Sequence, residues 1–176
     1  MSTSKAQRHR SARARLALLA ALVVQLVVPG LARGAAFETY SVTGYEVWFT
    51  PTVGTFVGTG GGSVGTLSAW QSSIEHSVVI SPTGTITGGW ATLYRLDGVR
   101  ISGYFSDGTV QQTYDGPDCT DESHAVTGSL TSVSRSDSAA VGTGVFEATL
   151  VHHRAWFFGR CISYSASVTG TISLLF

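Results

Sequence analysis

The chain has 176 residues, with 11 lysine and arginine residues and 11 aspartate and glutamate residues. Six of the basic residues precede Phe37, so the rest of the chain has five arginines, no lysine and all 11 acidic residues, for a net charge of −6. A lysine-free acidic surface repels phosphate backbones and anionic lipids, so we expect no nucleic-acid or membrane-surface partner.

The N-terminal segment, residues 1–36, is predicted to be a cleaved signal peptide. Basic residues lie between Lys5 and Arg15, thirteen mostly apolar residues follow at 16–28, and small residues stand at 34–36. Thirteen residues are too few for a membrane-spanning helix, which needs about 20; an uncleaved anchor is the alternative. The sequence therefore predicts a secreted protein whose single domain covers residues 37–176.

The remainder of the chain shows strand patterns without helical periodicity. Runs rich in Val, Ile, Thr and aromatic residues alternate with Gly, Pro and Asp, which is typical of an all-β domain. We expect an antiparallel up-and-down barrel of about eight or nine strands, because closure leaves no exposed edges; a two-layer sandwich is the alternative. The nine predicted strands are 38–49, 53–58, 64–80, 84–95, 99–105, 108–115, 123–134, 141–155 and 161–176.

Alternation along the last two strands predicts which side chains face the core. Apolar residues occupy even positions from 162 to 176, with Ser and Thr at most odd ones. Successive side chains point to opposite faces of a strand, so the even row should be buried. Strand 38–49 is apolar on both faces, as expected of a strand that is covered on both sides or lies at an interface.

A disulfide between Cys119 and Cys161 is predicted, because two cysteines in an exported chain usually pair. If Asp97-Gly98 and Asp107-Gly108 are both turns, the two cysteines lie at the same end of the sheet. The turns at 59–62 and 97–98 then share that end, and His76 lies near the opposite end.

Five side chains near the predicted disulfide are candidates for a binding site at one rim: His124, His152, Arg154, Trp156 and Tyr164. They continue apolar rows, so imidazoles and a guanidinium could fix a polar or anionic ligand group between aromatic walls. The alternative is that these are ordinary half-exposed side chains where strands leave the core.

No metal site or cofactor is expected. His76, His124 and His152 share apolar rows, but the predicted topology separates His76 from the other two, and His152 and His153 face opposite sides of a strand. The acidic loop around Cys119, with Asp115, Asp118, Asp121 and Glu122, lacks the spacing of an EF-hand and is expected to be solvated.

The sequence does not indicate an enzyme, because it contains no G-x-S-x-G elbow and no constrained Ser/His/Asp set. The leading hypothesis is a secreted, disulfide-bonded β-barrel that binds a small molecule or glycan at the rim near the cysteines. The alternatives are a barrel enzyme with His152 or His124 as acid/base and a structural or surface module without a pocket. The pattern indicates no particular ligand and no oligomeric state.

Overall fold

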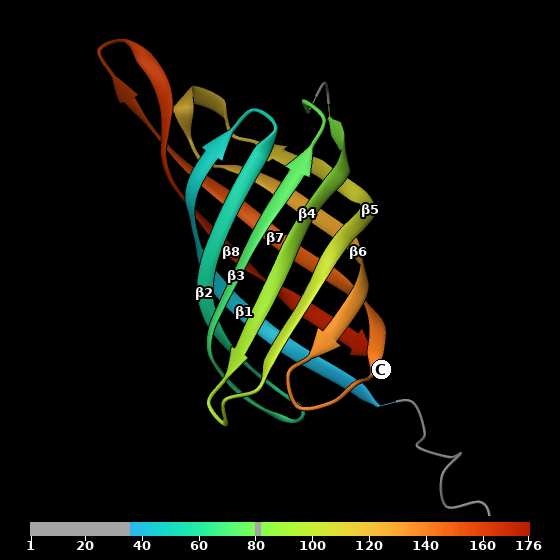
Figure 1. The fold of residues 1–176 in the computed structure, drawn as a ribbon. Helices are drawn as coiled ribbons and strands as arrows, with labels where there is room; N and C mark the ends of the chain where they lie inside the picture. The colour runs from blue at the N-terminus through green and yellow to red at the C-terminus, as the bar shows by residue number, and fades with distance from the viewer. Residues whose placement is uncertain (1–35, 80–81) are drawn as a thin grey trace, which may run out of the picture. The chain divides into compact units, whose positions relative to one another are not determined.

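The computed structural model describes residues 36–79 and 82–176, so the predicted signal peptide, apart from Ala36, lies outside the described residues. Eight antiparallel strands form a closed barrel in which each strand pairs with the next and β1 pairs with β8 (Figure 1). The predicted all-β barrel is confirmed, and the two-layer sandwich is wrong because the β1–β8 ladder closes the sheet. The strands are β1 (Phe37–Thr50), β2 (Val53–Gly62), β3 (Gly65–His76), β4 (Thr83–Arg95), β5 (Arg100–Asp115), β6 (Glu122–Arg135), β7 (Val141–Phe157) and β8 (Arg160–Leu175).

The predicted turn at Asp107-Gly108 is wrong, and the two strands on either side of it are one strand, β5. The register against β6 shifts between Phe105 and Asp107, and Gly108 has a φ of +144°. This irregularity moves the buried row from odd positions, ending at Phe105, to even positions that include Val110. The phase change in the sequence marks a bulge in one strand, because one extra residue reverses which face each side chain meets.

This correction changes which connections share an end. The β1–β2, β3–β4, β5–β6 and β7–β8 connections lie at one end, which we call the cavity end; the other three connections and both termini of the barrel lie at the closed end. The predicted placement of 115–122 and 155–160 together is right, and the disulfide between Cys119 and Cys161 is confirmed. The turns at 59–62 and 97–98 lie at the opposite, closed end, so their predicted placement is wrong.

The core consists of aliphatic side chains and five aromatic ones, Tyr40, Phe56, Trp70, Phe105 and Phe146, of which the last three form a cluster. Trp70 and Phe105 each contact Phe146, with ring centroids 6.3 and 6.0 Å apart. The indole of Trp70 donates a hydrogen bond from Nε1 to the Thr43 carbonyl oxygen at 3.0 Å. Gly58 makes room for this, since a Cβ there would lie 2.5 Å from Nε1 of Trp70. These rings fill the middle of the barrel.

The β7–β8 hairpin is longer than predicted and projects beyond the rim at the cavity end (Figure 1). Residues 155–160 were predicted as a turn-bearing segment, but β7 continues to Phe157 and β8 begins at Arg160. The turn consists of Phe158 and Gly159, both with positive φ (+48° and +73°), as in the type I′ turns that match strand twist. Within the described residues, no helix is long and apolar enough to cross a membrane.

Candidate functional site

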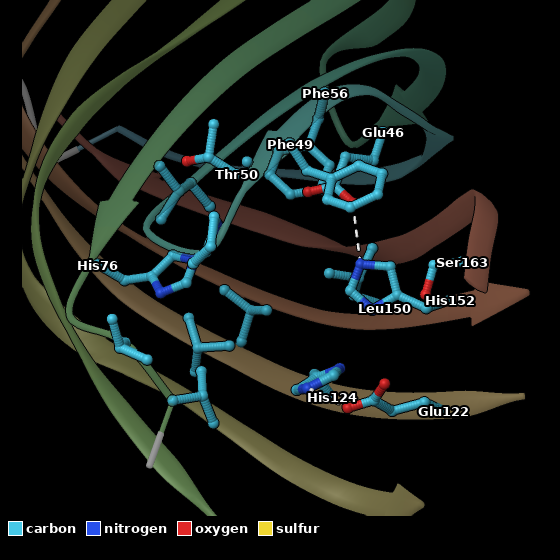
Figure 2. Close-up of a pocket in the computed structure, with 17 residues that line it drawn as sticks. Glu46, Phe49, Thr50, Phe56, His76, Glu122, His124, Leu150, His152 and Ser163 are labelled. Atoms are coloured by element: carbon cyan, nitrogen blue, oxygen red, sulfur yellow. Dashed lines mark hydrogen bonds and ion pairs between the residues drawn. The ribbon is translucent and has the colours of Figure 1, made fainter. Parts of the chain in front are cut away.

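A cavity of about 390 Å³ opens at the cavity end of the barrel (Figure 2). Its walls are mainly apolar, with Phe49 and Phe56 on one side and Ile74, Val126 and Leu150 among the aliphatic contributors. The polar side chains that line it are Glu46, Thr50, His76, Glu122, His124, His152 and Ser163. Its volume lies within the range of about 300–1,000 Å³ that is usual for small-molecule sites.

Glu46 and His152 form a buried pair in the wall of this cavity. Glu46 follows Val42 on the inner row of β1, and its side chain is 3 % exposed. The Nε2 atom of His152 lies 3.0 Å from Oε2 of Glu46, the interaction drawn as a dashed line in Figure 2. Gly54 on β2 leaves the room, since a Cβ there would lie 2.5 Å from Oε1 of Glu46. A carboxylate only accepts hydrogen bonds, so Nε2 of His152 carries the proton.

A second carboxylate and imidazole, Glu122 and His124, lie beside the first pair. Nε2 of His124 is 3.2 Å from Oε1 of Glu122, and the rings of His124 and His152 are 5.3 Å apart in an edge-to-face arrangement. Gln112 also donates to Oε1 of Glu122 at 2.7 Å, which fixes the carboxylate. The proximity of Glu122 favours the tautomer of His124 with its proton on Nε2.

The Nδ1 atom of His124 is buried in the cavity wall without a hydrogen-bond partner among the described residues. The residue is 6 % exposed, and burial lowers the pKa of His124, although the Glu122 carboxylate opposes the shift. The neutral ring therefore presents a lone pair at Nδ1. An unmet buried acceptor is costly, and ligand binding can remove that cost.

His76 also has a ring nitrogen that can accept a hydrogen bond in the cavity. Its Nδ1 lies 2.8 Å from the Ser77 carbonyl oxygen, so in the neutral ring Nδ1 carries the proton and Nε2 has the lone pair. Figure 2 shows His76 across the cavity from His124 and His152. The prediction that His76 lies at the opposite end of the barrel is therefore wrong, because it rested on the turn at Asp107-Gly108. In the described parts of the chain, no three His, Cys, Asp or Glu residues are grouped so that they could hold a metal ion.

The structure separates the five predicted site residues. His124 and His152 both line the cavity. Arg154 instead binds the β5–β6 loop: Nε donates to the Thr120 carbonyl oxygen at 2.7 Å, and Nη2 donates to Asp115 at 2.7 Å. Its contact with the cavity is indirect, through Nη1, which lies 3.6 Å from Glu122.

Trp156 and Tyr164 do not face the cavity, contrary to the prediction. Tyr164 is turned outward by an irregularity in which His153 pairs with Ser165 and Arg154 pairs with Ser163. Its ring lies 6.4 Å from that of His153 on the outer face. Trp156 keeps its expected parity but lies in the projecting hairpin, where no interior exists to cover it.

The lining residues that the sequence did not assign to the site include Glu46, Phe49, Glu122 and Ser163. The two carboxylates had a readable signal, because Glu46 shares the parity of Val42, and Glu122 that of His124. Ser163 had none, since the irregularity that turns it inward leaves no mark in the alternation. Phe49 is likewise brought inward after a register shift between Glu46 and Trp48.

No protein-family model, curated protein or solved structure matches this chain.

Proposed function

We propose that the protein binds a small, mainly apolar molecule that carries a neutral hydrogen-bond donor, such as a hydroxyl group, in the cavity. The observation that carries the proposal is that Nδ1 of His124 has no hydrogen-bond partner among the described residues. The residue is 6 % exposed and lies in a largely apolar wall. Neighbouring side chains cover this atom almost completely, so a ligand hydroxyl donates to it only after those side chains shift, and the donation then satisfies the buried acceptor.

The other two imidazoles support the same ligand class. In His152 and His76, as in His124, one ring nitrogen faces an oxygen acceptor of the protein, which leaves the other as an acceptor. Three lone pairs around an apolar space favour a ligand that donates. A glycan would need more polar partners than these walls offer.

An anionic ligand is disfavoured, contrary to the expected role of Arg154. The guanidinium is engaged with Asp115 and backbone carbonyl oxygens, while the cavity lining itself includes the carboxylates of Glu46 and Glu122. A ligand carboxylate would add a third negative charge to a partly desolvated site, which raises its free energy.

The test compares three probes of matched chain length by isothermal titration calorimetry: 1-decanol, its methyl ether and decanoate. We expect 1-decanol to bind about three- to tenfold more tightly than the ether, the usual worth of one hydrogen bond. Decanoate should bind at least about a hundredfold more weakly than 1-decanol because of the two carboxylates.

The variant His124→Leu removes the acceptor and should abolish the preference for the alcohol over the ether. His153→Leu is the matched control, since His153 faces the outside and contacts Asp121 and Ser167. Equal affinities for alcohol and ether in the wild-type protein, or tighter binding of decanoate, would contradict the proposal.

A second candidate, acid–base catalysis, is favoured by the carboxylate–imidazole pair of Glu46 and His152. The lone pair on Nδ1 of His152 is placed to take a proton from a water molecule that attacks an ester carbonyl, giving an acid and an alcohol, while Glu46 stabilises the imidazolium. Hydrolysis of p-nitrophenyl decanoate that is lost in His152→Leu and retained in His153→Leu would establish this activity; equal rates in both variants would exclude it for that ester.

We further propose that the protein is exported. The disulfide and the absence of a membrane-spanning helix among the described residues are compatible with an extracellular protein. N-terminal sequencing of protein from the culture medium should read from Phe37, and a start at Met1 on membrane-bound protein would contradict the proposal.

A further inference from the structure

The tip of the β7–β8 hairpin exposes three consecutive aromatic side chains. Trp156 is 63 % exposed, Phe157 58 % and Phe158 92 %, and we call these three residues the aromatic tip. They lie where the hairpin projects beyond the barrel rim, beside the end that holds the cavity (Figure 1). Large apolar side chains grouped in this way on a surface usually mark an interaction site.

The hairpin is built to hold these side chains in place. Trp156 pairs with Cys161 and Phe157 with Arg160 across the ribbon, so the backbone of the tip is hydrogen-bonded internally. An isolated two-stranded ribbon is only marginally stable in water. The disulfide from Cys161, opposite Trp156, to Cys119 ties this ribbon to the β5–β6 loop close to its tip. The exposure of the tip is therefore a fixed feature of the fold.

The hairpin segment itself carries a positive charge, although the β5–β6 loop that the disulfide joins to it is acidic, with Asp115, Asp118, Asp121 and Glu122. Residues 155–164 contain one cationic residue, Arg160, and no acidic residue. Tyr164 and, on β1, Trp48 add exposed aromatic surface at the same end of the barrel. Aromatic side chains with a nearby arginine are the composition that favours the boundary between water and lipid headgroups.

We propose that the aromatic tip docks on a zwitterionic phospholipid surface, with its rings among the headgroups and Arg160 beside a lipid phosphate. The shape of the tip favours this occupant over a protein, because a convex end of a narrow ribbon buries little of the roughly 800 Å² per partner that stable protein interfaces need. The β1–β8 ladder ends at Glu46 and Ala166, so the backbone groups on the edge of β8 between Ala166 and the turn need water as a hydrogen-bond partner. Insertion is therefore shallow.

The net charge of −6 for residues 37–176 is consistent with this choice of lipid. It opposes binding to anionic membranes but has little effect on a neutral zwitterionic surface. The proposal therefore departs from the expectation of no membrane-surface partner, which rested on repulsion from anionic lipids. Docking by the tip also brings the cavity end of the barrel to the lipid, from which an apolar ligand can be taken up.

The experiment measures sedimentation of the full, oxidised protein with phosphatidylcholine vesicles. The variant Trp156→Ser/Phe157→Ser/Phe158→Ser should lower the partition coefficient at least tenfold, whereas Leu96→Ser/Val141→Ser should change it less than twofold. The control residues are similarly exposed (70 % and 69 %) but lie at the closed end. Brominated lipids should quench tryptophan fluorescence in the wild-type protein and not in the tip variant.

Binding of 1-decanol in the absence of vesicles, measured on the tip variant, separates this proposal from the proposed function, because the tip does not line the cavity. Wild-type protein that stays in the supernatant, or a tip variant that sediments like the wild type, would overturn the proposal. A concentration-dependent dimer that the tip variant loses, without vesicle binding, would overturn it in favour of a second copy of the chain.

Discussion

The two ends of the barrel surround a buried glutamate side chain with different partners. Glu38 and Glu46 lie on the inner row of β1, eight residues apart, and the side chain of each is 3 % exposed. Glu38 at the closed end is bound by Arg135 and accepts a hydrogen bond from the Tyr40 hydroxyl at 2.8 Å. Glu46 at the cavity end has the imidazole of His152 beside about 390 Å³ of space.

The closed end is filled around its polar groups. Burial raises the pKa of Tyr40 to about 12, and the hydrogen bond with Glu38 adds to the shift, so the hydroxyl remains a donor. Arg135 also binds Asp137 and lies 5.3 Å from the centre of the Phe176 ring. The void between the strands there is only about 10 Å³, too small for more than one water molecule.

The cavity end has polar groups whose partners are incomplete. Two buried side-chain atoms among the described residues lack a hydrogen-bond partner, Arg95 Nε and His124 Nδ1. Arg95 lies at the closed end, where β4 ends, and is held by Asp97 through Nη2, whereas His124 borders the cavity. The closed end is therefore filled, whereas the cavity end leaves the space in which we propose that a ligand binds.

The largest expected effect concerns the disulfide, which the cavity end has and the closed end lacks. The bridge joins residues 42 positions apart. The double variant Cys119→Ser/Cys161→Ser should lower the free energy of unfolding by up to about 4 kcal/mol, the chain-entropy value for such a loop. Urea denaturation measures this, and an unchanged midpoint would show that the bridge does not constrain the unfolded chain.

The two buried glutamates should respond differently when their partners are removed. Arg135→Met strands the Glu38 carboxylate in a filled interior and should cost about 3 kcal/mol, near the lower limit for breaking a buried pair because Arg135 is partly exposed. His152→Leu leaves Glu46 next to a cavity that water can enter, so the expected loss is below about 1 kcal/mol. Equal losses in urea denaturation would contradict the contrast between the ends.

Replacing a core valine with phenylalanine distinguishes the filled part of the barrel from the cavity. Val168→Phe introduces a ring into the packed part of the barrel and should cost about 1–3 kcal/mol through overpacking. Val126→Phe extends into the cavity and should change the free energy of unfolding by less than about 1 kcal/mol while abolishing 1-decanol binding. Retained binding by the second variant would place the ligand elsewhere.

The smallest expected effect is the pH dependence that His124 gives to stability. Because burial lowers its pKa in the folded state, the unfolded chain takes up the proton first. This contribution is fully present above the ordinary histidine pKa of about 6.5 and is lost as the pH falls below it. Urea denaturation at several pH values should show a shallower decline in His124→Leu than in the wild type. A steeper decline in the variant would reverse the assigned sign.

Much of the architecture could be predicted from alternation, because a half-buried strand must repeat its pattern every two residues. The even row of β8 is buried as predicted from Ala166 to Leu174. The strand count failed at Asp107-Gly108, where the same dipeptide that makes tight turns instead permits a bulge. Local sequence does not distinguish these outcomes, since the choice depends on the partner strand β6.

The candidate site was only partly predictable for the same reason. His124 and His152 follow regular rows and reach the cavity. Unbroken alternation predicts that Tyr164 points inward. In the structure one unpaired residue in β8 reverses the alternation, and no residue type marks that point. His76 was misplaced by the false turn, which shows how one error in strand count displaces every later connection to the opposite end.

The most direct test of the central claim, that the cavity offers imidazole lone pairs to a donating ligand, is ¹⁵N NMR of the histidine rings. The spectrum should show His124 and His152 protonated at Nε2 and His76 protonated at Nδ1. Addition of 1-decanol should shift the Nδ1 resonance of His124, while that of the outward-facing His153 stays in place. A proton on Nδ1 of His124, or a His124 resonance that 1-decanol leaves unchanged, would contradict the claim.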